Sequence, residues 1–121
     1  MHRIEVELRA GAAIVHAEGE LDAYAAPELS ECLEGIAGSR YAVANLAAVS
    51  FMDSTALGLV VKAVRELTES GAAVRVVLPR GTARRIFEIT TLDRVLPLAR
   101  SADAALAELV PSAGPGLAGP G

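Results

Sequence analysis

Aromatic side chains are scarce in this sequence, where they make up 3% of the residues, and tryptophan is absent. Hydrophobic residues nonetheless amount to 52% of the chain, so alanine, valine, leucine and isoleucine must build the core. An aliphatic core of this kind fits helices layered on a β-sheet. With 121 residues, the chain suits one domain with one hydrophobic core.

Cysteine is equally rare, since Cys32 is the only one in the chain. A single cysteine excludes an intramolecular disulfide and a cysteine-rich zinc site. Cys32 falls into an apolar helical spacing with Leu29, Leu33 and Ile36, which favours an inert thiol in the core.

The chain also lacks an excess of positive charge, because its formal net charge is -4. Direct binding of nucleic acid is therefore not expected. The first five residues become charged at once, unlike a signal peptide, and no apolar run approaches the ~18 residues of a membrane span. We expect a cytoplasmic protein that does not enter the membrane.

The common motifs of catalysis and metal binding are missing as well. There is no GxSxG, no Walker signature and no HExxH, and no acid pair or Cys/His cluster suggests a metal or a cofactor. His16 has no second ligand at metal spacing and is interpreted as a solvent-facing strand residue. A serine hydrolase built on Ser54 would need a base brought close through space, and a fluorophosphonate probe would reveal it.

Strand and helix patterns alternate after an initial hairpin, which predicts an α/β fold with a mixed sheet and a parallel centre. The residues after Pro111 are rich in glycine and proline and are interpreted as a disordered tail, 111–121. The predicted strands are 4–8, 12–17, 41–49, 74–78 and a short edge strand, 95–98. The predicted helices are 25–37, a long one from Leu57 to Gly71, 83–90 and a last one capped by Ser101.

Polar residues interrupt the apolar pattern between Val49 and Gly58, where a strand gives way to a helix. Asp53 or Ser54 is expected to cap that helix, and Phe51 and Met52 are expected to anchor the turn. A hydroxyl at the positive end of a helix dipole is also a good place to attach a phosphate. In sheets with parallel strands, binding sites tend to lie at such carboxyl ends.

Two further features of the helical segments concern binding. Leu59 projects away from the apolar stripe of its helix, near Glu66, and is a candidate exposed contact for a partner. Arg80, Arg84 and Arg85 could bind an anion, although a solvated helix face is the simpler interpretation.

Four segments of the chain carry a joint pattern, namely 19–22 (GELD), 26–29 (APEL), 49–58 (VSFMDSTALG) and 92–96 (LDRVL). Together they resemble the bacterial anti-sigma factor antagonists of the STAS family. The resemblance covers about residues 4–110 and implies one STAS domain, 1–110, with four to five strands and about four helices mainly on one side of the sheet. It also implies partner switching, in which an anti-sigma factor that is a serine kinase binds the unphosphorylated antagonist, silences it by phosphorylation, and a phosphatase restores it.

The resemblance also implies the residues of the site. Ser54 matches the phosphorylated hydroxyl, with Thr55 as the fallback. Asp22 matches an acid implicated in kinase contact. The Asp22→Ala variant is therefore expected to bind the partner more weakly, with little change in its melting temperature. Two positions depart from the family, since Ala56 stands where glycine is common and Asn45 where an acid is common. The implied partner-binding residues are Asp22, Asp53, Ser54, Thr55, Ala56 and Leu59.

The departures carry expectations of their own. Ala56 adds a methyl group beside the docking turn and is expected to tune partner choice, whereas Asn45 is expected to affect the turn. Two alternatives to phosphoregulation remain at this point. Ser54 could be a simple helix cap, and the domain could be a scaffold or a ligand- or nucleotide-sensing STAS module without a phosphorylation switch.

Overall fold

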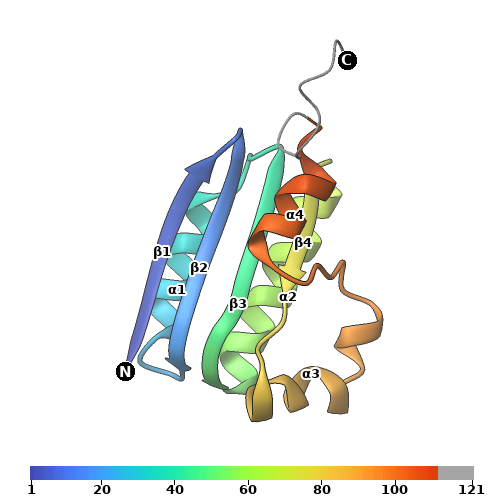
Figure 1. The fold of residues 1–121 in the computed structure, drawn as a ribbon. Helices are drawn as coiled ribbons and strands as arrows, with labels where there is room; N and C mark the ends of the chain where they lie inside the picture. Colours follow the sequence, from blue (N-terminus) through green and yellow to red (C-terminus); the bar gives the residue numbers. More distant parts are fainter. Residues whose placement is uncertain (112–121) are drawn as a thin grey trace.

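A four-stranded mixed sheet organises the computed structural model, which describes residues 1–111 (Figure 1). The strands follow one another in the order β1-β2-β3-β4, with β1 antiparallel to β2 and the other neighbours parallel. The predicted mixed sheet with a parallel centre is confirmed, whereas the predicted tail, 111–121, lies outside the described residues except for Pro111. The strands are β1 (His2–Arg9), β2 (Ala12–Leu21), β3 (Tyr41–Met52) and β4 (Ala73–Val77).

Helices cover both faces of this sheet unequally. The two longest, α1 and α2, lie side by side behind the sheet in Figure 1, and α4 crosses the front of β3 and β4. This arrangement matches the prediction of helices mainly on one side. The helices are α1 (Ala26–Gly35), α2 (Ser54–Glu69), α3 (Arg85–Ile89) and α4 (Ala102–Leu109), with 3-10 turns η1 (Gly81–Arg84) and η2 (Leu92–Arg94).

The unequal cover divides the core into two clusters of buried side chains. The larger cluster fills the space under α1 and α2 and includes Leu29, Val60 and Phe87. The smaller one joins Val43 of β3 to Leu106 of α4. β3 is therefore buried on both faces only in its first half, and its α4 side is open to solvent from Ala48 onward.

The predicted edge strand 95–98 is reduced to a single bridge. Leu98 pairs in parallel with Val76, and the carbonyl of Pro97 accepts from the Val76 amide at 2.7 Å. Proline has no amide hydrogen to continue a ladder, and η2 precedes it, so no longer strand forms. Val95, expected inside that strand, is 73% exposed.

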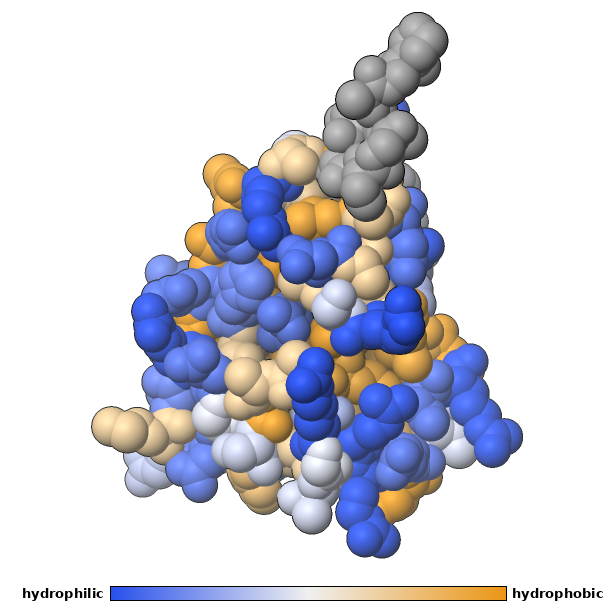
Figure 2. All heavy atoms as spheres, in the orientation of Figure 1, coloured by the Kyte–Doolittle hydropathy of each residue, from blue (hydrophilic) through white to orange (hydrophobic). Residues whose placement is uncertain are grey.

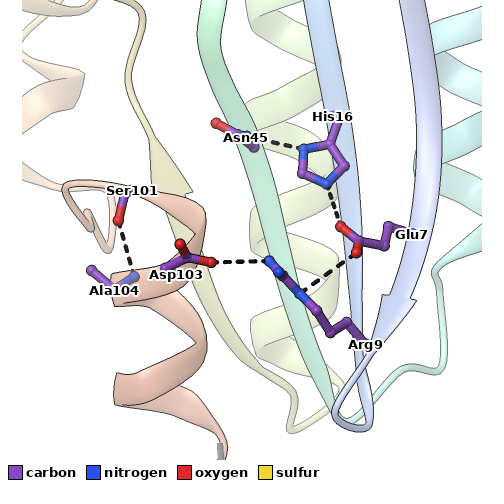
Figure 3. Close-up of polar contacts among 7 residues, drawn as sticks. All are labelled: Glu7, Arg9, His16, Asn45, Ser101, Asp103 and Ala104. Atoms are coloured by element: carbon purple, nitrogen blue, oxygen red, sulfur yellow. Dashed lines mark hydrogen bonds and ion pairs between the residues drawn. The ribbon is translucent and has the colours of Figure 1, made fainter. Parts of the chain in front are cut away.

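A polar network crosses the open side of the sheet (Figure 3). His16 Nε2 lies 2.7 Å from Glu7 Oε1, and the second oxygen of Glu7 lies 3.6 Å from Arg9 Nε. Arg9 in turn reaches Asp103, the acidic residue in the first turn of α4, at 3.3 Å. Side chains of β1 and β2 are thus tied to the helix that covers the front of the sheet.

Asn45 of β3 completes the network on its far side. Its Oδ1 accepts from the Ala47 amide at 3.2 Å, which directs the Asn45 Nδ2 group toward His16 Nδ1 at 3.0 Å. His16 therefore accepts through Nδ1 and donates through Nε2. Asn45 lies inside β3, so the expectation that it affects the turn is wrong. His16, interpreted from the sequence as a solvent-facing strand residue, is half-buried and belongs to this network.

Cys32 is half-buried on α1 and packs against the larger core cluster. Partial burial, together with the charges of Glu28 and Glu31, raises the pKa of its thiol. The thiol therefore stays protonated, as the interpretation as an inert residue requires.

Among the described residues, none of the helices combines the length and the apolar composition that a membrane span requires.

Gly19, near the end of β2, lies against the backbone of Met1, so a substitution at Gly19 tests how much this close packing contributes to stability. Its φ is +82°, and a Cβ there would collide with the carbonyl oxygen of Met1, so Gly19→Ala is expected to lower the free energy of unfolding by more than about 1 kcal/mol. Gly58 in α2 is the matched control, because a Cβ there meets nothing within 4 Å. Gly58→Ala should raise stability by up to about 1 kcal/mol. Urea unfolding measures both changes, and equal effects would contradict the prediction.

The Glu7 network predicts an acid-dependent part of stability. The hydrogen bond from His16, reinforced by the charge of Arg9, holds the pKa of Glu7 below its ordinary value of 4.5. A carboxyl group whose pKa is lowered on folding stabilises the fold above its unfolded pKa, and this contribution disappears as the pH falls through the folded pKa. We expect Glu7→Gln to flatten the loss of stability below pH 4.5.

The control for this measurement is Glu5→Gln. Glu5 lies on the same strand but outside the network, and its carboxylate pairs with Arg3. Urea midpoints of the three proteins across the acid range give the comparison. Identical acid slopes for the wild type and Glu7→Gln would show that the network adds nothing.

Candidate functional site

The parallel pairing of β2 with β3 brings two turns to one edge of the sheet. Leu21 and Met52, the last residues of these strands, are partners in register, and the Asp53 amide donates to the Leu21 carbonyl at 3.2 Å. Asp22 and Asp53 therefore leave the sheet as neighbours. The structure thus brings together two of the acids that the sequence predicted for one site.

Asp53, and not Ser54, caps α2. Its backbone is extended, with φ -94° and ψ 177°, and its Oδ1 accepts from the Ala56 amide at 2.9 Å. Ser54 is the first residue of the helix and is exposed, as is Thr55. The structure thereby decides between the two capping residues that the sequence left open.

The Ser54 hydroxyl is not used in the packing of the turn. Within residues 1–111, none of the side-chain hydrogen bonds involves it. The first amides of α2 have no partner within the helix, and the dipole of this long helix places partial positive charge there. A phosphate on Ser54 would face solvent and a favourable helix end.

Asp22 has a structural task in addition to any contact with a partner. Its Oδ1 accepts from the amides of Tyr24 at 3.0 Å and Ala25 at 3.3 Å. Its carbonyl accepts from Ala25 and Ala26, and Ala25, the N-cap of α1, has no side-chain bond of its own. Asp22 therefore shapes the turn that starts α1, a role that the sequence analysis did not assign.

Ala56 and Leu59 lie deeper than expected. Ala56 is 0% exposed, so its methyl group packs under the turn and cannot itself touch a partner in this conformation. Leu59 is half-buried and packs against the core, where it lines a groove of about 380 Å³ between α1 and α2 together with Leu33 and Glu66. The expectation of a freely exposed Leu59 is therefore wrong, although its position near Glu66 is confirmed.

Two exposed aromatic residues flank the turn, and the sequence analysis missed both. Tyr24 is 88% exposed in the loop after Asp22, and Phe51 is 48% exposed. Successive strand residues point to opposite faces, so Met52 is 5% exposed in the core while Phe51 points to the opposite face, at the end of β3 that α4 leaves uncovered. Phe51 is therefore not the anchor that was expected. The sequence does contain a signal for Tyr24, which is an aromatic residue between Ala23 and Ala25 in the segment that joins a strand to a helix.

The histidines of the chain contact other groups. His2 Nε2 lies 2.8 Å from Glu28, and His16 belongs to the network of Figure 3. Neither is within hydrogen-bonding distance of Ser54. Residues 1–111 also contain no group of three or more His, Cys, Asp or Glu side chains that could hold a metal ion. The turn at Ser54 is thus a surface of acids, hydroxyls and aromatic rings.

Comparison with known proteins relates this chain to a family. The family model described as "STAS domain" matches residues 3–105. The anti-sigma-B factor antagonist of Staphylococcus aureus (strain NCTC 8325 / PS 47) is 40% identical over 80 residues, which is 64% of this chain and 74% of that relative. The anti-sigma-B factor antagonist of Staphylococcus epidermidis is 39% identical with the same coverage.

Solved structures agree in fold. An anti-sigma factor antagonist from Mycobacterium paratuberculosis is 29% identical, with a TM-score of 0.80 over 90% of this chain and 94% of that one. The Bacillus cell fate determinant SpoIIAA, in its phosphorylated form, is 24% identical with a TM-score of 0.67 over 88% of this chain and 98% of that one, which shows the fold alone. By sequence and by structure, this chain belongs to the STAS domain family.

Proposed function

We propose that this protein is an anti-sigma factor antagonist whose binding is switched by phosphorylation of Ser54. In the unphosphorylated state it binds an anti-sigma factor that is also a serine kinase, and this releases the sigma factor. The observation that carries the proposal is the free and exposed Ser54 hydroxyl at the start of α2, left available because Asp53 makes the cap. The names of the relatives support the general role.

The proposed binding surface consists of the turn residues Asp22, Asp53, Ser54 and Thr55, with Tyr24 and Phe51 beside them. Aromatic residues are enriched at protein interfaces, where a few such residues carry most of the binding energy. The pairing of β2 with β3 holds the two turns in one arrangement, so little ordering is needed on binding. Ala56 would influence this surface only through the packing beneath it.

A phosphate at Ser54 would separate folding from binding. It adds a charge of about -1.5 to -2, and the helix end offsets part of this by about 0.3 to 1 kcal/mol. Against a bound partner, an acid about 5 Å away would repel each unit of charge by roughly 3 kcal/mol at an effective dielectric near 20. Since 1.4 kcal/mol is about tenfold in affinity, each unit of charge would weaken binding by about a hundredfold, and the phosphorylated protein would lose at least that much affinity while keeping its fold.

The proposed switch also needs a step that removes the phosphate from Ser54. An exposed phosphoserine on the first helical residue is accessible to a phosphatase, and we propose that a serine phosphatase restores the binding state. A regulator of sigma factors acts where transcription occurs, so the proposed role places the protein in the cytoplasm.

Variants of Ser54 test the switch. Ser54→Ala should bind the cognate anti-sigma factor continuously, whereas Ser54→Asp should fold normally and bind at least about tenfold more weakly, because it places a negative charge in the interface. Calorimetry with the purified anti-sigma factor gives the affinities. Incubation with ATP followed by mass spectrometry of the peptide locates the phosphate.

Thr55→Ala is the matched control, since it removes the neighbouring exposed hydroxyl and leaves Ser54 in place. It should still be phosphorylated. Phosphate on Thr55 alone would contradict the assignment of Ser54 as the phosphorylated residue. Phosphate on neither residue would favour a scaffold or a ligand-sensing STAS module.

Asp22 needs two substitutions, because its charge and its turn hydrogen bonds must be separated. Asp22→Asn keeps the oxygen that accepts from Tyr24 and Ala25, so it should leave the melting temperature near that of the wild type and weaken partner binding. Asp22→Ala also removes the acceptor and should cost about 0.5–2 kcal/mol of stability, as for a lost helix cap. This revises the expectation of little change in melting temperature. Unchanged binding by Asp22→Asn would make the residue purely structural.

A further inference from the structure

A cavity lined by arginines shares no lining residue with the Ser54 turn. It has a volume of about 350 Å³ and lies between the end of β4, η1, the bridge at Leu98 and α4. Arg80, Arg84 and Arg100 line it, with Val77 and Leu98 among the apolar residues. Figure 2 shows apolar surface framed by hydrophilic side chains on this face, below α4. None of the lining residues belongs to α2 or to its cap.

We propose that this cavity binds a small organic phosphate. The three guanidinium groups would hold the phosphate, and the apolar lining would hold the organic part. Arginine presents a planar fork of donors that matches phosphate oxygens in pairs, which suits this task.

The charges around the cavity are not balanced within the described part of the chain. Glu108, the one acid of the lining, is held by Arg75 at 2.9 Å, and Arg84 has a 3.6 Å contact with Glu88. Arg80 and Arg100 have no ion pair among residues 1–111. When Arg75 and Glu88 are counted with the charged lining residues, there are four arginines and two glutamates around the cavity. The local charge is therefore about +2 in a protein whose net charge is -4. A bound anion would relieve the repulsion between these guanidinium groups.

The backbone around Arg100 is held in place, so this arginine starts from a fixed position. Pro97 and Ala99 both bond to Val76 of β4, at 2.7 and 3.0 Å, just before Arg100. Ser101 then caps α4 by accepting from the Ala104 amide at 3.0 Å. A preformed arrangement of this kind lowers the entropy that a ligand must overcome.

Size and lining favour an organic phosphate over the inorganic ion. Small-molecule sites occupy about 300–1,000 Å³ and are mostly apolar, with a few polar groups that fix the ligand. Leu98 and Ala99 are half-buried and form the accessible apolar part of the lining. Inorganic phosphate would leave this surface uncovered, so it should bind more weakly.

Phenyl phosphate is a suitable probe, because it combines a phosphate with an apolar ring. We expect saturable one-to-one binding by calorimetry, weaker binding of inorganic phosphate and benzoate, and amide shifts in NMR spectra at Val77 and Ala99. Arg80→Gln and Arg100→Gln should each weaken binding by about tenfold to a hundredfold, the usual effect of losing hydrogen bonds to a charged group.

Arg85→Gln is the matched control, since Arg85 is an exposed neighbour of Arg84 that does not line the cavity. It should bind phenyl phosphate like the wild type, and circular dichroism checks that all variants fold. The proposal is overturned if phenyl phosphate does not saturate the protein at millimolar concentration, or if Arg85→Gln weakens binding as much as Arg100→Gln. Benzoate binding as tightly as phenyl phosphate would overturn the assignment to phosphate. Anti-sigma factor binding is not used in this test, so its result is independent of the proposed function.

Discussion

The parallel pairing of β2 with β3 is the constraint on which the site depends. Because Leu21 pairs with Met52, both strands end at the same level, and the Asp53 amide extends the ladder to Leu21. A shift of register by one residue would turn both core side chains to the wrong face of the sheet. The turn at Asp22 and the cap at Asp53 are therefore neighbours for the same reason that the core is packed.

A division of tasks follows from this pairing. Asp53 satisfies an amide of α2, so Ser54 next to it needs no structural partner, and Asp22 shapes the start of α1 in the same manner. Ala56 lies beneath both turns and is fully buried. The residues that hold the turns and the residue that is free for modification are thus adjacent in sequence but distinct in role.

Two polar groupings of the structure differ in how their charges are satisfied. The network around His16 is paired along its length, since Glu7, Arg9, Asn45 and Asp103 provide partners from two strands and a helix (Figure 3). The arginines beside β4 lie around an open cavity and keep an excess of positive charge. Networks that are fully paired contribute to a single packing of the fold, whereas unbalanced charge beside a cavity favours a ligand.

The sequence by itself determined what depends on local periodicity. The buried run of β3, the apolar stripe of α2 and the polar turn between them follow from patterns within a few residues, and so does a capping acid or hydroxyl at Asp53 or Ser54. Only the tertiary structure decided which strand face a helix covers, so the exposure of Phe51, the burial of Leu59 and the partners of His16 were not predictable. The physical reason is that side-chain exposure and long-range hydrogen bonds depend on elements distant in the chain, and no local pattern records which of them will pack there.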